Sequence, residues 1–534
     1  MSTNGQSPFT GSLRHQLLLG LALVVLGSLY AVRLNEVPIG AVTDDAYYVE
    51  MARSIAEGLG PVINTGPDVA PHDPDIFPPG FPLLLSPLAR AWPDSLSALK
   101  AVPLLGALML LPLCWWLPGA KAARGLRLAL VAVVMFNPWV VSWSGRILSD
   151  IPFAALSLAA LLLFVRLHDR LCGPDQPAVP WVGVVGLVLL CAAAVSVRTI
   201  GWAAVLAMSA TLLTRRRWWV AIALPVLVAA LVWLISQAMP NGGELLSQGY
   251  SSQMFSHGNQ PYWRFVLHNA LQYVAELPVI LVPVFGNPVK ALMLRLHMEM
   301  LYPAAAFIVG TQLLFLVGLA VGRLWRRETG GVRVRLFVFY LLIYGAVLTQ
   351  FNGYPSGVQT RLLIPVLPIL VWFVLAGLHE RFDPGHRLIP QLVLGLMLIA
   401  AFGHNGWRVA RPLRTAVEAN GRGLVDPETG SAWLRTHTQP DNVIMAQEPL
   451  VRHIHFQRPV VATPHALSAE SVARMVQEFA VSYVLVGPVV HHQPHRLDAK
   501  GQALLDILQS QPALYQAVHA DPVANIHIFS CASD

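Results

Sequence analysis

The sequence has few charged residues for its length. Of 534 residues, 12% are Asp, Glu, Lys or Arg and 55% are hydrophobic, and the mean hydropathy is +0.55. A soluble protein normally carries about 25% charged residues, so this composition excludes an ordinary soluble enzyme. Apolar runs of bilayer-spanning length recur between Leu17 and Phe402. We therefore expect a polytopic α-helical membrane protein.

Cysteine is scarce as well. The sequence shows no CxxC spacing, and three of the cysteines lie in or beside apolar runs; the four are Cys114, Cys172, Cys191 and Cys531. This pattern predicts neither a disulfide framework nor a zinc site built on sulfur. No motif for binding a soluble nucleotide is present.

Basic residues give a net charge of +7, but they are spread over short loops between apolar runs. We therefore expect no nucleic-acid partner. The positive-inside rule places these loops in the cytoplasm, and the densest contains Arg323, Arg326, Arg327, Arg333 and Arg335. We predict eleven transmembrane helices, at about 17–34, 101–117, 126–143, 151–165, 181–197, 200–213, 218–236, 304–321, 336–350, 362–378 and 388–402. An odd number of spans places the C-terminal segment outside the cytoplasm.

Two parts of the chain differ in composition. Residues 1–404 are predicted to form the transmembrane domain, which includes a long first outer loop at 35–100. Residues 405–534 are predicted to form a small extracytoplasmic α/β domain, because short apolar strands alternate there with helical segments. The expected strands are 443–446, 460–462, 482–487 and 526–529. The many histidines of this segment lack regular metal-ligand spacing and are interpreted as surface or packing residues.

The first outer loop begins with the stretch TDDAYYVEMAR, residues 43–53. Asp44 and Asp45 suit the start of a helix, where carboxylates accept backbone N–H groups and meet the positive end of the helix dipole. Apolar residues then recur at helical spacing, which predicts an amphipathic helix on the outer membrane surface. One acid would be enough for a cap. Two adjacent acids beside a bilayer therefore indicate a function.

The same loop continues with PHDPDIFPPGFPLLL, residues 71–85. The Pro-Pro-Gly sequence predicts a sharp turn before an interfacial or re-entrant segment. His72, Asp73 and Asp75 are candidate ligands for a divalent metal cation. They are equally consistent with a solvated loop, and spacing leaves both interpretations open.

Three arginines are predicted at outer helix ends, against the positive-inside trend: Arg146, Arg198 and Arg361. Each one alone could be a snorkelling anchor. Together, on the side that bears the paired acids, they indicate an anion site, because the guanidinium group is permanently charged and binds phosphate with a planar fork. Asp150 lies close to Arg146 in the sequence, within the short loop SGRILSD.

Several of these stretches resemble the polytopic GT-C glycosyltransferases, in particular the protein mannosyltransferases and the lipid A aminoarabinose transferase. The similar stretches are TDDAYYVEMARSIAEG, FPPGFPLLL, GRILSDIPF, VRTIGW and RLLIPVLP, spread over residues 15–404. The resemblance implies an inverting transfer of a sugar from a polyprenyl-phosphate donor to a hydroxyl of a lipid, glycan or protein acceptor. The chain is bacterial in style, so we also expect location in a bacterial inner membrane, with the catalytic loops and the C-terminal domain on the periplasmic side.

The resemblance also implies roles for single residues. Asp44 would be the general base, Asp45 would orient the acceptor or help to hold a metal, and Asp150 matches a second acid of the family. Arg198 and Arg361 match basic positions near the donor phosphate, with Arg146 as a third candidate. Many relatives carry Asp-Glu where this chain carries Asp-Asp, and the shorter second acid reaches less far.

Three other classes of function fit parts of the sequence. A transporter or flippase predicts charges at mid-membrane and an internal repeat, and neither is evident. A ligase or polymerase acting on a polyprenyl-linked glycan would use the outer arginines without needing the acidic helix. A binding protein anchored by its bundle would make Asp44 dispensable and residues 405–534 essential.

Overall fold

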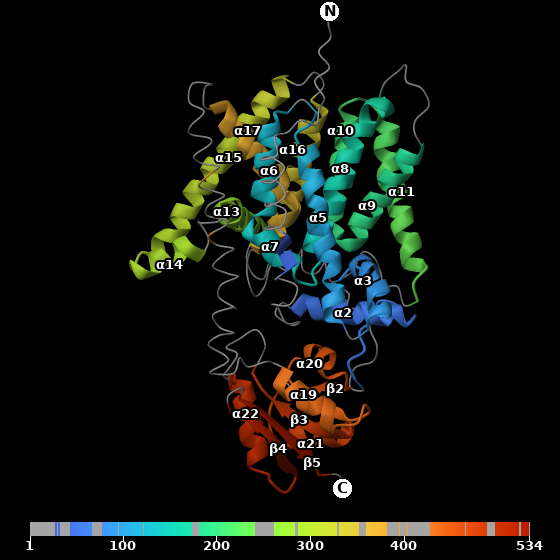
Figure 1. Cartoon of the computed structure of the whole chain (residues 1–534), viewed down its shortest axis with the longest axis vertical. Helices are drawn as coiled ribbons and strands as arrows, with labels where there is room; N and C mark the ends of the chain where they lie inside the picture. Colours follow the sequence, from blue (N-terminus) through green and yellow to red (C-terminus); the bar gives the residue numbers. More distant parts are fainter. Residues whose placement is uncertain are drawn as a thin grey trace, which may run out of the picture.

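A computed structural model describes the fold of most of the chain. The described residues are 27–28, 30–31, 43–66, 77–93, 95–120, 122–172, 181–240, 261–282, 287–327, 331–351, 359–381, 395, 403, 428–464, 466–488, 497–522 and 525–532. Over these ranges the chain forms a bundle of long apolar helices and a separate α/β unit at the C-terminal end (Figure 1).

Within the described ranges, six helical segments are long and apolar enough to cross a membrane. They comprise α4 and α5 (Leu96–Leu99 and Ala101–Trp116), α8 (Asp150–Cys172), α11 (Trp218–Gln237), α15 (Tyr302–Arg327), α16 (Val332–Thr349), and η3 with α17 (Thr360–Val366 and Leu367–Arg381). The expectation of a polytopic helical membrane protein is therefore confirmed.

The span predicted at 126–143 is a bent pair, α6 (Arg124–Met135) and α7 (Pro138–Ser144), with an angle of 52° between them. Pro138 cannot donate a backbone hydrogen bond, and the Asn137 side chain accepts one from the Trp139 N–H instead, so a new helix begins there. The two predicted spans around Arg198 are shorter apolar helices, α9 (Trp181–Val197) and α10 (Trp202–Leu213), joined through η1 (Thr199–Gly201). The predicted spans at 17–34 and 388–402 lie almost entirely outside the described residues, so the count of eleven stays a prediction.

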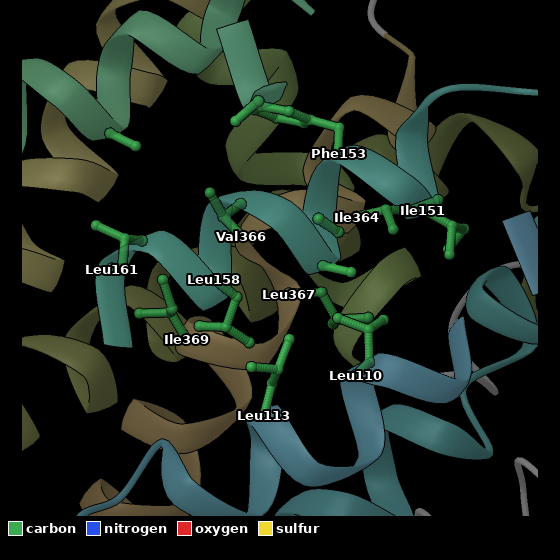
Figure 2. Packing of buried hydrophobic residues seen from close by; sticks show 14 of the residues in the cluster. Leu110, Leu113, Ile151, Phe153, Leu158, Leu161, Ile364, Val366, Leu367 and Ile369 are labelled. Atoms are coloured by element: carbon green, nitrogen blue, oxygen red, sulfur yellow. The ribbon is translucent and has the colours of Figure 1, made fainter. Parts of the chain in front are cut away.

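The bundle is held together by a continuous hydrophobic core. Figure 2 shows side chains from α5, α8, η3 and α17 meeting within it: Leu110 and Leu113, Ile151, Phe153, Leu158 and Leu161, Ile364 and Val366, and Leu367 and Ile369. The span at 360–378 has 83% of its apolar window buried and the one at 150–168 has 72%, against 17% for 302–326. Thus α8 and α17 form the centre of the bundle, and α15 presents most of its surface outward.

Successive long helices run in opposite directions through the bundle, so the connections between them lie at one or the other of its two ends (Figure 1). The arginine-rich connections α10–α11 and α15–α16 lie at the end of the bundle away from the C-terminal unit (Figure 1). The start of α8, the end of α9 and the start of η3 lie at the other end. This second end faces α2 (Thr43–Ala56) and α3 (Gly80–Ala91), which lie between the bundle and the C-terminal unit (Figure 1).

The segment between α11 and α15 contains two helices that the sequence reasoning did not predict. These are α13 (Tyr262–Leu281) and α14 (Asn287–Arg295), followed by the short η2 (Glu299–Leu301). The Asn269 side chain of α13 donates to the carbonyls of Thr349 and Phe351 at the end of α16. Gly310 lets α15 approach α13 closely, since an added Cβ at Gly310 would lie 2.0 Å from the carbonyl oxygen of Val274 in α13.

The C-terminal unit is a five-stranded sheet in its described part, with the order β2-β1-β3-β5-β4. The strands are β1 (Val443–Ala446), β2 (Val460–Ala462), β3 (Val481–Val486), β4 (Tyr515–Asp521) and β5 (Ile526–Cys531). The helices are α19 (Glu428–His437), α20 (Pro449–Phe456), α21 (Ala469–Glu478) and α22 (Ala499–Gln509). The pairs β1–β2 and β1–β3 are parallel, and β5 is antiparallel to both its neighbours.

Alternating side chains explain how this sheet is covered. In β1, Met445 packs with α21 and α22 on one face, whereas Ile444 and Ala446 pack with Leu434 of α19 on the other. The predicted α/β organisation of this segment is therefore confirmed. The sequence reasoning missed β4, because most of its residues are polar or small and its only aliphatic side chain larger than alanine, Val518, is exposed, as expected for an edge strand.

Candidate functional site

The two adjacent acids at the start of α2 lie in different surroundings. Successive helical residues point about 100° apart. Asp44 is 28% exposed, and its Oδ2 accepts a hydrogen bond of 2.7 Å from Nη2 of Arg361. Asp45 is 2% exposed and attracts the buried ammonium group of Lys100 at the start of the second predicted span. The pair therefore offers one accessible carboxylate and one internal carboxylate.

A second ion pair lies at the start of α8. Nη1 of Arg198 donates to Oδ1 of Asp150 at 2.6 Å and to Oγ of Ser149 at 3.3 Å. Asp150 is 1% exposed, and as the first residue of α8 it also meets the positive end of a helix dipole. The Tyr48 hydroxyl of α2 lies 3.0 Å from Ser149 Oγ. The acidic helix is thereby tied directly to this ion pair.

Arg361 connects the two pairs. The carboxylates of Asp150 and Asp44 both attract its guanidinium group, and Arg198 repels it, so all four charges lie near one another. The Arg361 guanidinium also lies over the Trp143 ring, 5.7 Å from its centroid, and Arg146 lies over the same ring at 4.6 Å. The structure thus brings Asp44, Arg146, Asp150, Arg198 and Arg361 together at one end of the bundle, although they come from four separate parts of the sequence.

Two buried polar atoms of this cluster have unused hydrogen-bonding capacity. Among the described residues, neither Nη1 of Arg361 nor Oδ2 of Asp150 has a hydrogen-bond partner. A buried donor or acceptor without a partner is unfavourable by about 1–3 kcal/mol. These two atoms are therefore the places where a bound ligand or water would be stabilised most.

Four residues of the site were missed by the sequence reasoning: Lys100, Trp143, Glu276 and Thr360. Lys100 is a basic residue at an outer helix end, so the signal that pointed to the arginines would also have found it. Glu276 of α13 accepts a hydrogen bond from the Thr360 hydroxyl, next to Arg361. No sequence pattern pointed to Glu276, because α13, the helix that places Glu276 near Arg361, was not predicted.

The candidate metal ligands His72, Asp73 and Asp75 lie outside the described residues. Across the described ranges, no group of three or more His, Cys, Asp or Glu side chains is placed to hold a metal ion. Asp44 and Asp150 are each bound by an arginine and do not converge on one point. The described residues therefore do not fit a metal centre.

This bundle, with an acidic helix across the end that carries the two ion pairs and an α/β unit beyond, has the GT-C fold. It is similar to the structure of ArnT, the lipid A aminoarabinose transferase, from Cupriavidus metallidurans bound to undecaprenyl phosphate. The TM-score is 0.62 at 11% sequence identity, and the match covers 98% of this chain and 99% of that one.

An archaeal protein gives a second match. The oligosaccharyltransferase AglB from Archaeoglobus fulgidus, in complex with an inhibitory peptide and a dolichol-phosphate, matches with a TM-score of 0.50 at 11% identity over 89% of this chain and 70% of that one. The same enzyme has been crystallised with Zn and sulfate, and that structure matches with a TM-score of 0.51 at 13% identity. No protein-family model matches the sequence, and no curated protein sequence matches it significantly.

Proposed function

We propose that this protein is an inverting glycosyltransferase that moves a sugar from a polyprenyl-phosphate donor to a hydroxyl acceptor at the outer face of the membrane. The observation that carries the proposal is the cluster of Asp44, Arg361, Asp150 and Arg198 at the outer end of a GT-C bundle. The similar ArnT structure contains undecaprenyl phosphate and the similar AglB structure contains dolichol-phosphate. Both ligands are lipid phosphates of the proposed donor class.

The donor phosphate is assigned to the arginines. Arg361 already binds Asp44 through Nη2, and its Nη1 has no partner among the described residues, so this second N–H group can donate to a phosphate oxygen. Arg198 is held in place by Asp150, which we propose as its anchor, and Arg146 adds a third positive charge beside Trp143. Positive charge placed where the phosphate leaves lowers the barrier, because negative charge develops there in the transition state.

Asp44 is assigned as the general base because it is the more exposed of the two acids. The acceptor oxygen attacks the anomeric carbon from the face opposite the phosphate, and the acceptor proton passes to the Asp44 carboxylate. A new carbon–oxygen bond to the acceptor forms while the bond from the anomeric carbon to the phosphate oxygen breaks. The products are the glycosylated acceptor, with inverted configuration, and free polyprenyl phosphate.

Asp45 is assigned a supporting role, because its burial beside Lys100 keeps it away from an acceptor that reaches Asp44. We propose that this internal pair fixes the start of α2 relative to the start of α5. The described charges of the site lie at helix ends, which favours a transferase over a transporter with charges at mid-membrane. We further propose the division into a transmembrane domain at 1–404 and an extracytoplasmic domain at 405–534, with this side of a bacterial inner membrane being periplasmic.

The test is release of free polyprenyl phosphate by the purified protein in detergent, with lipid-linked sugars and total envelope acceptors supplied. Asp44→Asn is expected to lower the turnover rate by about 100-fold or more, since general base catalysis contributes about 10²–10⁴-fold. The matched control is Glu57→Gln, which neutralises an exposed acid just beyond the end of the same helix. Equal release by wild type and Asp44→Asn would move the base to another residue. No release by wild type with every donor and acceptor class would overturn the proposed function.

A further inference from the structure

The C-terminal unit is in direct contact with α2 and with the segment that follows it, at Thr65 and Gly66. The Val460 N–H of β2 donates to the Thr65 carbonyl at 2.8 Å, so the segment after α2 is hydrogen-bonded to an edge strand of the C-terminal sheet. The backbones approach so closely here that a Cβ on Gly66 would lie 2.5 Å from the Val460 carbonyl oxygen. Just before this segment, α2 packs against α20 (Figure 1).

A titratable pair lies within this contact. Oε2 of Glu50, on α2, is 3.8 Å from Nε2 of His453, on α20. Glu50 is 6% exposed, because α20 packs against this part of α2. Its Oε2 has no hydrogen-bond partner among the described residues.

The tautomer of His453 follows from its other ring nitrogen. Nδ1 lies 2.7 Å from the Arg458 carbonyl oxygen, which only accepts hydrogen bonds, so Nδ1 carries a hydrogen. In neutral His453, Nε2 is therefore an acceptor, and it faces a carboxylate oxygen that is also an acceptor. A single additional proton relieves this unfavourable meeting of two acceptors: on His453 it gives an ion pair at the observed 3.8 Å, and on Glu50 it gives a donor that faces Nε2.

The charges around the pair allow such a proton to be held near neutral pH. Burial raises the pKa of Glu50 to about 7; Arg53 lowers it, Glu57 raises it and a backbone hydrogen bond from Asn64 lowers it. Burial lowers the pKa of His453, although the hydrogen bond to Arg458 acts in the opposite direction, and Arg53 lowers it further. Arg452, the other charged residue of α20 near His453, donates to the Pro488 carbonyl instead.

We propose that Glu50 and His453 share one proton and act as positioning residues, through which the C-terminal unit holds α2, and with it Asp44, in place at the site. This inference rests on the proposed function for the role of Asp44. Asp44 and Glu50 are six residues apart on the same helix, about 9 Å along its axis. A shift of α2 at Glu50 is therefore transmitted to the carboxylate that contacts Arg361.

The sign of the pH dependence follows from the two pKa shifts. The pKa of Glu50 is raised from its ordinary 4.5, so its contribution to the contact is complete below that value and is lost as pH rises through about 7. The pKa of His453 is lowered from 6.5, so its contribution is complete above that value and is lost as pH falls through the lowered pKa. Above pH 6.5 only Glu50 still titrates, so the contact weakens as pH rises toward about 7 and changes little at higher pH.

The test is amide hydrogen exchange of full-length protein in detergent, followed for peptides that cover α2 and α20. Protection factors, corrected for intrinsic exchange, are compared at about pH 6 and about pH 8. In wild type, the protection of α2 is expected to fall by up to about tenfold in all between pH 6 and pH 8, with most of the fall below the Glu50 pKa of about 7 and little change beyond it. In Glu50→Gln, which carries no titratable proton, α2 protection is expected to stay level over this range. Glu470→Gln removes an exposed acid of the C-terminal unit and is expected to behave as wild type.

A second variant covers the case in which Glu50→Gln does not fold. His453→Gln places a permanent amide donor opposite the Glu50 carboxylate and is expected to reduce the fall in protection as pH rises. The same fall in wild type, Glu50→Gln and His453→Gln would overturn the inference. With an active enzyme, both variants are also expected to move the alkaline limb of the kcat/KM profile, whereas Glu470→Gln is not. Failure of the proposed function would appear as absent activity in wild type and would leave the exchange result intact.

Discussion

Arg198 shows how a residue can have both a structural and a functional task. Its partner Asp150 is 1% exposed, so removing the guanidinium group leaves a buried carboxylate without its counter-charge. We expect Arg198→Met to lower the free energy of unfolding by about 3 kcal/mol. Thermal unfolding in detergent measures this loss. The control is Arg474→Met, which breaks an exposed pair with Glu470 and is expected to change stability by less than about 0.5 kcal/mol.

Arg198→Lys separates the two tasks. Lysine keeps a positive charge beside Asp150 but replaces the planar fork by a single ammonium group. We therefore expect unfolding close to that of wild type, together with a higher KM for the lipid-phosphate donor. A KM equal to that of wild type would show that Arg198 supports the fold without contacting the phosphate.

The approach of α3 to α9 is set by a glycine of the Pro-Pro-Gly turn. A Cβ on Gly80 would lie 2.4 Å from the backbone carbonyl carbon of Ser196, two residues before Arg198. We expect Gly80→Ala to push these helix ends apart, lower stability by about 1–3 kcal/mol and reduce transferase activity. The control is Gly322→Ala in α15, where an added Cβ meets nothing within 4 Å and helix propensity favours alanine. Equal behaviour of the two variants would contradict this account of the turn.

The arrangement of the described helices predicts the orientation of the bundle in the membrane. The basic connections lie at one end, and the site and the C-terminal unit lie at the other (Figure 1). The positive-inside rule then places the first end in the cytoplasm. In a background with the four native cysteines replaced, we expect Glu470→Cys to react with a membrane-impermeant thiol reagent in intact spheroplasts. Arg215→Cys is expected to react only after permeabilisation, and the reverse pattern would invert the proposed topology.

Much of this organisation could be predicted from the sequence. Low charge and long apolar runs require a membrane-spanning bundle, because buried backbone groups in lipid must be satisfied within helices. Alternation of strands and helices identified most of the C-terminal sheet. The acid pair and the three outer arginines were singled out because charges beside a bilayer are costly unless they serve a purpose. A residue such as Glu276 could not be found in this way, since its helix is only weakly apolar.

The sequence by itself therefore determined the class of protein, the positions of most helices and strands, and which charged residues deserved a functional interpretation. The tertiary structure decided how those residues are paired. Asp44 with Arg361, Asp150 with Arg198, and Glu50 with His453 are separated by long stretches of chain. It also decided that Asp45 and Glu50 are buried while Asp44 is accessible. The physical reason is that hydropathy depends on a residue and its near neighbours, whereas burial and charge pairing depend on which distant helix packs against it.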